Sequence, residues 1–450
     1  MPARVPTVSA GFLGSKWFRW FGRDPLGLLD HVRENFGPIM LTRMGPYPYC
    51  FVNDPMLVHE ALVTKAKYFQ KEPRLRKLLR TVDGDGLLVS EGALWMKQRR
   101  MLQPAFHRKR IAGYAATMVE QSALFFQRWA GGKVRDIRKD MIDLAIAVAA
   151  QVFFGANLTG SSAGLGAAVQ ELSFILFRKS MSAAVFPEWV PTPLNTRLKR
   201  ARTPLLEMVD GLIAARRSDG GDRGDLLSML LLAVDEEGDG KGMSDKQARD
   251  EIITGFNAGH DTTGGTLSWF WTLMAEHEDV QDALAARARE VLGQRAPDFG
   301  DLAALQPIEA AIKETQRLYP AAWSLFGRRA VEDVELGGYA ISAGTQIAIF
   351  PWIIQRNAKF WPQPEKFDPA RFAPENSSAM VPYSWLPFGL GPHVCIGQQF
   401  ALTEMTLAAA MALRSFRVSR PEGEAPPRPL PLITLQPDQL KLRVSERTDG

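Results

Sequence analysis

The stretch Pro387-Phe388-Gly389-Leu390-Gly391-Pro392-His393-Val394-Cys395-Ile396-Gly397 contains one of the two cysteines of the chain. Its glycines permit positive φ angles and a close approach of the backbone to a flat group, while its two prolines stiffen the turns. A helical pattern starts directly afterwards, at Gln398. The sulfur of Cys395 is therefore expected beside a helix N-terminus, where the helix dipole favours thiolate over thiol. The stretch predicts a loop that presents one thiolate.

A single thiolate is a known axial ligand of haem iron. A structural zinc site needs four ligands, and the chain offers two cysteines and six scattered histidines, so the sequence argues against zinc. An isolated cysteine is most often a small buried residue. Cys50, within the strand-like run Tyr49-Cys50-Phe51-Val52, fits that role. Cys395, within its glycine-rich loop, indicates haem ligation instead.

This loop resembles the haem-binding loop of the cytochrome P-450 family, which follows the pattern Phe-x-x-Gly-x-(Arg/His)-x-Cys-x-Gly. The positions that match are Phe388, Gly391, His393, Cys395 and Gly397. The resemblance implies haem b as the cofactor and Cys395 as the axial ligand of its iron. It also places Phe388, Gly389, His393 and Gly397 in contact with the haem.

Composition favours a globular protein of ordinary polarity. Of the 450 residues, 46% are hydrophobic and 23% are charged, and the net charge is +5. No long run of one sign suggests a nucleic-acid-binding tail. Two cysteines fit a reducing compartment, so we expect a cytoplasmic protein. The chain starts without a signal-peptide pattern and contains no apolar window of about 20 residues. We therefore expect a soluble protein without a transmembrane anchor.

Local signals predict a mainly α fold with small β-sheets. Helix starts are expected at Asp24-Pro25 and at Asp54-Pro55, and the second helix is expected to run to about Phe69. A hairpin is expected over residues 39–52 and an irregular segment over residues 70–90. From there to about Leu292 the pattern is helical. Later strands are expected near residues 331–336, 339–341, 345–350 and 432–442. The simplest division is an N-terminal arm, residues 1–23, and one catalytic domain, residues 24–450, which by resemblance has the cytochrome P-450 fold.

The arm contains the aromatic patches Phe12-Leu13 and Trp17-Phe18-Arg19-Trp20-Phe21. Such a short amphipathic patch could touch a membrane surface or line an access channel. Packing of the patch against the body of the protein is the favoured interpretation.

A second motif lies in a long predicted helix. The pair Ser244 and Gln247 forms a capping box, and the helical pattern runs to about His277. Near its middle stands Ala258-Gly259-His260-Asp261-Thr262-Thr263-Gly264-Gly265, whose glycines and threonines weaken a helix. We expect a local distortion there, such as a π-bulge. In isolation, a threonine bonded back to a carbonyl and a solvated aspartate would be the simpler interpretation.

The same motif resembles the oxygen-activating helix of the family. The resemblance implies that Asp261 and Thr262 deliver protons to dioxygen at the haem and that Ala258 borders the cofactor. A third motif, Glu314-Thr315-Gln316-Arg317, places Glu314 and Arg317 on one helix face. By resemblance these two residues form a structural triad with Arg371, from Phe367-Asp368-Pro369-Ala370-Arg371-Phe372, in which arginine binds a carboxylate bidentately.

Haem propionates need cationic or hydrogen-bonding partners. Trp95 and Arg99 lie at positions i and i+4 of a predicted helix, as in the family, and His393 occupies the position that the family fills with arginine or histidine. In Phe326-Gly327-Arg328-Arg329-Ala330 one arginine is expected to reach a propionate. Arg328 is the preferred candidate, with Arg329 as the alternative.

The resemblance implies a monooxygenase that inserts one oxygen atom of O2 into a C–H bond. The chain has no flavin or iron–sulfur motif, so electrons are expected from a separate ferredoxin or flavodoxin with its reductase. Between residues 96 and 110 the chain carries six basic residues and no acidic one. This segment, which includes Lys97, Arg100 and Arg108, is the predicted docking surface, and ordinary solvated surface is the alternative.

The substrate is expected to be lipophilic, because the segments that correspond to family substrate contacts, among them Leu87-Leu88-Val89 and Ile433-Thr434, are mainly apolar. Fatty acids lead on overall resemblance, followed by terpenoids and steroids; Arg74, Arg76 or Lys77 could hold a carboxylate. A peroxide-driven haem-thiolate hydroxylase and a non-catalytic haem sensor are the alternative functions. Neither would need Asp261 and Thr262, so this pair argues against both. We expect a monomer.

Overall fold

The structure is a computed structural model that describes residues 2–11, 14–45, 47–155, 162–180, 182 and 186–447. Its contacts divide it into two compact units. The first unit comprises residues 1–77 and 313–395, and the second unit comprises residues 78–312 and 396–450. The division into an arm, residues 1–23, and a catalytic domain stays a prediction.

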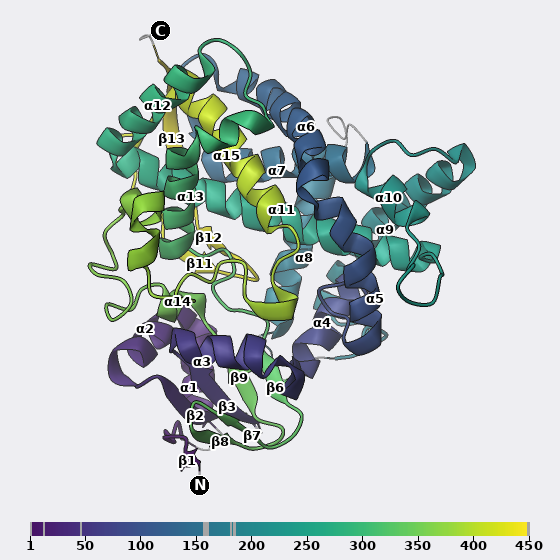
Figure 1. Cartoon of the computed structure of the whole chain (residues 1–450), viewed down its shortest axis with the longest axis vertical. Helices are drawn as coiled ribbons and strands as arrows, with labels where there is room; N and C mark the ends of the chain where they lie inside the picture. The colour runs from purple at the N-terminus through teal and green to yellow at the C-terminus, as the bar shows by residue number, and fades with distance from the viewer. Residues whose placement is uncertain are drawn as a thin grey trace. The chain divides into compact units, whose positions relative to one another are not determined.

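The first unit is built around a five-stranded sheet (Figure 1). Its strands, in spatial order, are β2 (Ile39–Met44), β3 (Tyr47–Val52), β9 (Gln346–Ala348), β6 (Arg328–Ala330) and β4 (Phe69–Lys71). Strands β2 and β3 form the predicted antiparallel hairpin, in which Ile39 pairs with Val52. Cys50, on β3, is fully buried in the hydrophobic core beside this sheet, as the strand-like run around it predicts.

Short helices and a smaller sheet complete the first unit. The helices are α1 (Ser15–Arg23), α2 (Pro25–Asn35), α3 (Pro55–His59) and α14 (Pro351–Ile354), and the smaller sheet joins β1 (Ala3–Arg4), β8 (Tyr339–Ile341) and β7 (Val334–Leu336). Asp24 caps α2 by accepting from Gly27 N at 2.9 Å, as its Asp-Pro signal predicts.

Trp17 and Phe21 of the N-terminal aromatic patch pack inward, whereas Trp20 is exposed. Trp17 is buried, and the ring of Phe21 lies 6.0 Å from that of Trp323 and 6.3 Å from that of Phe350. These contacts support the packing interpretation of the patch over contact with a membrane. Phe12 and Leu13 lie outside the described residues.

The second unit is a helical assembly around α11 (Asp245–Glu276) (Figure 1). The other helices are α5 (Gly92–Leu102), α6 (Arg108–Phe126), α7 (Ile137–Phe154), α8 (Ser162–Ser180), α9 (Pro193–Asp219), α10 (Leu226–Leu232), α12 (Glu278–Leu292) and α15 (Gln398–Ser415). Helices α11 and α7 pack closely at Gly264, where an added Cβ would lie only 2.9 Å from the Cα of Ile142. The glycine therefore permits this helix crossing.

Two small sheets lie at the C-terminal end of the second unit. One joins β10 (Phe416–Ser419), β13 (Lys441–Glu446) and β5 (Val134–Asp136), and the other joins β11 (Pro429–Pro431) and β12 (Leu435–Pro437). Strand β12 runs alongside α11, where the indole Nε1 of Trp269 donates to the Leu435 carbonyl at 3.3 Å. Residues 435–437 of β12 therefore lie beside the long helix α11.

Two local predictions are wrong. Residues 70–90 are not irregular, because α4 (Pro73–Asp83) occupies half of them. Its first turn is capped by Glu72, whose carboxylate accepts from the backbone N–H groups of Arg74 at 2.9 Å and Leu75 at 2.6 Å. The helix predicted from Pro55 to about Phe69 is divided into α3, a π-helical turn over Glu60–Thr64 and a 3₁₀ turn over Ala66–Tyr68.

Candidate active site

The cysteine loop folds back on itself and exposes its sulfur-bearing side chain. The backbone N–H of Cys395 donates to the Phe388 carbonyl at 2.9 Å, and that of Val394 donates to the Gly391 carbonyl at 3.0 Å. The side chain of Cys395 is exposed. Gly391 has a φ of 75°, and a Cβ at this position would lie 2.0 Å from the Leu62 carbonyl oxygen. Only glycine fits there, because the backbone approaches too closely for a side chain.

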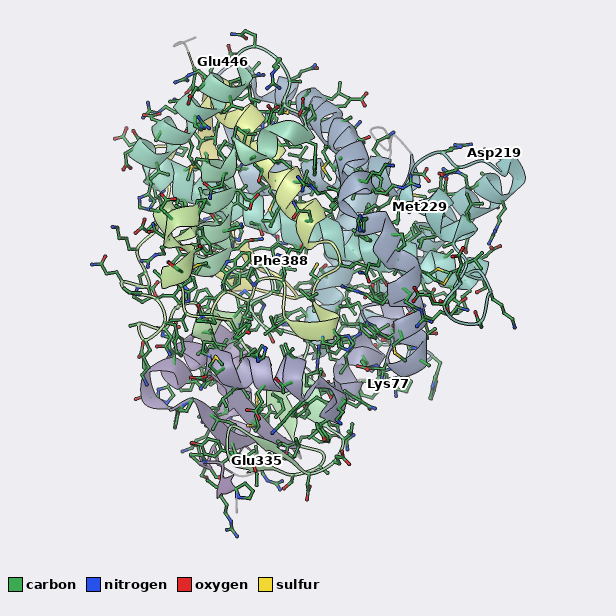
Figure 2. The ribbon with its side chains drawn as sticks, viewed as in Figure 1. Lys77, Asp219, Met229, Glu335, Phe388 and Glu446 are labelled. Atoms are coloured by element: carbon green, nitrogen blue, oxygen red, sulfur yellow. The ribbon has the colours of Figure 1, made fainter. Side chains whose placement is uncertain are left out.

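The stem of the loop is anchored in the first unit. Phe388, labelled in Figure 2, packs its ring edge-on against Trp385, with centroids 5.9 Å apart. The indole Nε1 of Trp385 donates to the Lys313 carbonyl at 3.2 Å, and the Leu386 N–H donates to the Gln355 side chain at 2.6 Å. These contacts hold the start of the loop against helix α13 (Gln306–Leu318).

The two charged residues of the Glu-x-x-Arg motif meet the later Arg371 in the first unit. Arg317 binds the fully buried carboxylate of Glu314 bidentately, with Nε–Oε2 at 2.7 Å and Nη2–Oε1 at 2.8 Å. Arg371 Nε lies 3.4 Å from Oε1 of the same carboxylate. Arg317 also donates to the carbonyls of Gln355 and Pro364, at 2.8 and 2.7 Å. The group therefore ties α13 to the segment that precedes the cysteine loop.

Arg328 and Arg329, the two candidate propionate ligands, are neighbours on strand β6. Arg328 is buried, with its Nη1 donating to the Phe326 carbonyl at 2.7 Å, whereas Arg329 is exposed. Successive side chains of a strand point to opposite faces. The two arginines therefore lie on opposite faces of the sheet, and the choice of Arg328 over Arg329 stays a prediction.

Helix α11 is an unbroken α-helix, so the predicted π-bulge is wrong. Thr262 Oγ1 donates to the carbonyl of Ala258, four residues earlier, at 2.7 Å. The next threonine hydroxyl in register, that of Thr266, donates in the same way to the Thr262 carbonyl at 2.8 Å. Hydroxyls that bond back to i−4 carbonyls need no extra residue in the turn, so the helix accommodates the motif without a bulge.

Asp261 is buried rather than solvated. Its Oδ2 accepts from Thr434 Oγ1 at 2.6 Å, and its Oδ1 accepts from Gln436 Nε2. The neighbouring His260 is also buried, with Nδ1 2.6 Å from the Phe256 carbonyl oxygen, and burial lowers the pKa of its imidazole. A neutral histidine therefore stands beside an aspartate that is held by two neutral donors.

Comparison with known proteins decides the family. A family model described as cytochrome P-450 matches residues 12–444. The chain belongs to the cytochrome P-450 family. It is 35% identical to cyclooctat-9-en-7-ol 5-monooxygenase of Streptomyces melanosporofaciens, over 96% of this chain and 90% of that protein. It is 33% identical to cyclooctatin synthase of the same organism, over 93% of this chain and 91% of that protein.

The fold of this cytochrome P-450 also matches a solved structure. The crystal structure titled as the heme domain of cytochrome P-450DA aligns with a TM-score of 0.89 and 27% identity, covering 99% of this chain and 98% of that one. The predicted family, the mainly α fold with small sheets, the monooxygenase class and haem b as cofactor are thereby confirmed. None of the helices in the described ranges has both the length and the apolar character needed to cross a bilayer.

The donor groups of this cytochrome P-450 fit a haem. The first unit offers the exposed Cys395 thiol on a fixed loop, together with Arg328 and the half-buried His393. The second unit offers Trp95 and Arg99, both half-buried and one turn apart on α5, while Gly397 precedes α15. No cluster of three or more His, Cys, Asp or Glu side chains suited to a bare metal ion occurs among the described residues. A single thiolate with separate cations suits an iron porphyrin with two propionates.

Two features of this cytochrome P-450 escaped the sequence analysis. Thr434 was expected only as a substrate contact, and Gln436 was not singled out, yet both hold Asp261. The basic segment is also partly neutralised: Lys97 Nζ lies 2.7 Å from Asp239 Oδ1, and Arg100 Nη2 lies 3.0 Å from the buried Asp235. The sequence shows no acid near these cations, because both partners come from residues about 140 positions later.

Proposed function

We propose that this cytochrome P-450 hydroxylates a polycyclic, terpenoid-type alkene or alkenol. The observation that carries the proposal is the 33–35% identity, over more than 90% of the chain, to two bacterial proteins, one of which is named for the oxidation of an alkenol. The apolar segments predicted to contact the substrate suit such a molecule. Residues 87–89, Leu-Leu-Val, and the exposed Ala258 on α11 offer hydrocarbon surface with few polar groups.

Each residue has one role in this proposal. Cys395 would supply a thiolate ligand to the haem iron, and Trp95, Arg99, Arg328 and His393 would hold the propionates; the haem, when bound, would supply the activation of dioxygen. Asp261 and Thr262 control protons. The Thr262 hydroxyl, which donates to the Ala258 carbonyl, can turn to donate to dioxygen. The carboxyl of Asp261 can exchange protons with solvent once it leaves Thr434 and Gln436.

A separate acidic protein, a ferredoxin or flavodoxin, is proposed as the electron donor. Because Lys97 and Arg100 are paired with aspartates, the docking charge falls on Arg108 and Lys109, which are exposed. Exposed cations steer an acidic partner and raise its association rate at low salt. The low cysteine content supports a cytoplasmic location, where such donors and their reductases operate.

The first test is spectroscopic. The dithionite-reduced protein under carbon monoxide is expected to show the strongly red-shifted Soret band of thiolate-ligated haem, and Cys395→Ser is expected to lose it. A red-shifted band in the variant would mean that another residue ligates the iron.

The second test is turnover of cyclooctat-9-en-7-ol, a matching alkene and a long-chain fatty acid. Each is supplied either with a ferredoxin, its reductase and NADPH or with hydrogen peroxide alone. Faster oxidation of the alkenol or alkene with the electron-transfer proteins would support the proposal. Preference for the fatty acid would overturn the substrate class, and activity with peroxide alone would overturn the need for an electron donor.

The third test concerns the docking surface. Charge reversal of Arg108 and Lys109 to glutamate is expected to slow reduction by the ferredoxin about tenfold at low salt, through the association rate. The matched control reverses Lys133, an exposed lysine elsewhere in the second unit. Equal slowing by the control would show a general effect of net charge rather than docking at this surface.

A further inference from the structure

Asp83, the last residue of α4, is a buried carboxyl that faces helix α11 within the second unit. Its Oδ1 accepts from Asn257 Nδ2 at 2.9 Å, and its carbonyl oxygen accepts from Thr254 Oγ1 at 3.3 Å. Asn257 directly precedes Ala258 and lies one turn before Asp261 in the sequence. The end of α4 is therefore bound to the part of α11 that carries the proton-controlling residues.

The segment after Asp83 lies directly on the same helix. The backbone N–H of Asp85 donates to Asp250 Oδ2 at 3.0 Å, and that of Leu87 donates to Glu251 Oε2 at 2.9 Å. A Cβ at Gly84 would lie 2.3 Å from the Asp250 carboxyl carbon, and one at Gly86 would lie 2.0 Å from Thr254 Oγ1. The two glycines thus let the backbone approach the α11 side chains. We name residues 83–87 the clasp segment.

The pairing of Asp83 with Asn257 is complete only if Asp83 carries a proton. Asn257 Oδ1 is buried and has no hydrogen-bond donor among the described residues. A carboxylate can only accept hydrogen bonds, whereas a carboxylic acid also donates one. An acid and a primary amide that meet side by side can exchange two hydrogen bonds, N–H to carbonyl and O–H to carbonyl. A neutral Asp83 therefore supplies the donor that Asn257 Oδ1 lacks.

The surrounding charges favour the neutral form. Burial, reinforced by the negative charge of Asp250 and opposed by the Asn257 hydrogen bond, raises the pKa of Asp83 to about 7. Lys246 pairs with Asp250 at 2.6 Å, and Arg80 hydrogen-bonds Asp85 through Nε at 2.6 Å. No ion pair of Asp83 occurs within the described ranges. The charged groups on the elements packed around it are Lys246, Arg249, Asp250 and Glu251 on α11, Arg80 and Asp85 on its own segment, and Arg202 on α9, which donates to the Thr81 carbonyl.

We propose that Asp83 is a positioning residue whose protonation closes the clasp segment onto α11 and whose ionisation releases it. In the closed form the neutral carboxyl and the Asn257 amide satisfy each other. Loss of the proton to solvent leaves a charged Asp83 near the carboxylate of Asp250, which contacts the same clasp segment. It also removes the donor to Asn257 Oδ1. The consequence for catalysis rests on the proposed function. Leu87, Leu88 and Val89 are proposed substrate contacts, so release of the segment loosens the substrate-binding side of the second unit.

Hydrogen exchange of the haem-loaded protein tests the clasp directly. Amides of residues 84–89 are followed by mass spectrometry at about pH 5.5 and about pH 8 and corrected for the intrinsic pH dependence of exchange. In the wild type, exchange at the higher pH is expected to be at least about tenfold faster, because Asp83, with a pKa of about 7, is mainly neutral at the lower pH and mainly charged at the higher one. Equal corrected exchange at the two pH values would overturn the proposal.

Two variants sharpen this test. Asp83→Asn keeps the shape and replaces the acid by an amide that donates at every pH, so slow exchange is expected at both pH values. Asn257→Ala removes the partner while keeping the carboxyl, so fast exchange is expected at both. Glu404→Gln, which changes another buried acid of the second unit, is the matched control and is expected to follow the wild type. A pH effect that persists in Asp83→Asn would assign the titration to another group.

Infrared spectroscopy reports the protonation state of Asp83 itself, which a merely structural role would not change with pH. The carbonyl stretching band of a protonated carboxyl is expected in the wild type at the lower pH, weaker at the higher pH, and reduced in Asp83→Asn at the lower pH. An unchanged band in Asp83→Asn would show that Asp83 is ionised throughout and would overturn the proposal even if that variant were unstable.

Kinetics separates this inference from the proposed function. With cyclooctat-9-en-7-ol as the probe, KM is expected to rise several-fold above about pH 7 in the wild type and to stay flat in Asp83→Asn, with kcat less affected. If no alkenol reacts but hydrogen exchange at residues 84–89 depends on pH as expected, only the proposed substrate class is overturned. Turnover with a flat KM and pH-independent exchange would overturn the clasp alone.

Discussion

Glu314 in the first unit and Asp261 in the second are both buried carboxylates, but their partners differ in charge. Glu314 is fully buried between the guanidinium groups of Arg317 and Arg371, at 2.7 and 3.4 Å. Asp261 accepts from two neutral side chains, those of Thr434 and Gln436. A carboxylate compensated by buried cations cannot move without leaving charge uncompensated. One held by neutral donors leaves no buried cation uncompensated when it moves, which suits a role in chemistry.

The largest effect is expected from Glu314→Gln. Removing one partner of a buried ion-pair network leaves the guanidinium groups uncompensated, so the variant is expected to lose about 3–5 kcal/mol of unfolding free energy. Chemical denaturation followed by circular dichroism, together with haem content, measures this loss. The control is Glu290→Gln, whose exposed pair with Arg287 is worth about 1 kcal/mol or less. A loss for Glu314→Gln as small as that of the control would remove the contrast between the two carboxylates.

Asp261→Asn is expected to show the opposite pattern. The amide keeps an oxygen for Thr434 and the shape of the site but turns an N–H group toward the Gln436 amide nitrogen, so stability is expected to fall by about 1–3 kcal/mol, less than for Glu314→Gln. Turnover is expected to fall about 100-fold or more, as for a lost proton-transfer group. Steady-state kinetics with an unchanged haem spectrum checks this prediction. A large loss of stability with little loss of turnover would make Asp261 a structural residue like Glu314.

Glu404, on α15, extends the comparison to a buried carboxyl that forms no ion pair within the described ranges of the chain. Its Oε1 has no hydrogen-bond partner in the described part of the chain, and burial raises its pKa from 4.5 to about 8. The folded protein therefore binds this proton more tightly than the unfolded chain does, and stability falls as the pH rises from about 4.5 through 8.

Glu404→Gln is expected to remove this dependence. At pH 9 the variant should be more stable than the wild type by several kcal/mol, since each unit of pKa shift is worth about 1.4 kcal/mol, and at pH 4 the two should be equal. Thermal midpoints measured across this range test the difference. Parallel midpoint curves for variant and wild type would show that Glu404 is compensated in the folded protein.

The smallest effect is expected at an exposed pair. Asp239→Asn breaks the ion pair with Lys97, and because Asp239 is exposed to solvent the loss should change stability little. The freed cation is expected to raise the association rate of an acidic electron donor about twofold at low salt, with no difference at high salt. Stopped-flow reduction at two ionic strengths measures this. Slower reduction in the variant would place the docking surface elsewhere.

The contrast between these sites also explains what could be predicted from the sequence. Glu314, Arg317 and the cysteine loop are readable because their spacing is local: one helical turn, or one loop of eleven residues with fixed turn chemistry. The capping box of Ser244 and Gln247 is local in the same way and forms as expected. Helix α4 was equally readable in principle, since Glu72 caps it ahead of Pro73, but its density of basic residues obscured the apolar spacing.

Partners that meet across long sequence separations could not be predicted. Thr434 and Gln436 reach Asp261 from 173 and 175 residues away, through a short strand that carries no motif. Asp235 and Asp239 neutralise a basic segment that contains no acid of its own. In each case the pairing depends on where separate elements pack, and a local pattern contains no information on that.

The central sheet of the first unit has a consequence for synthesis in the cell. Strand β3 pairs with β2 on one side and in parallel with β9 on the other, so residues 49–51 obtain their second strand partner only when residues 346–348 have been made. Translation at about 5–20 residues per second requires about 15–60 s for the intervening residues. During that interval the edge of the hairpin has no strand partner, and unpaired edges promote aggregation. The yield of folded protein should therefore respond to translation speed and chaperone supply more strongly than its final stability would suggest.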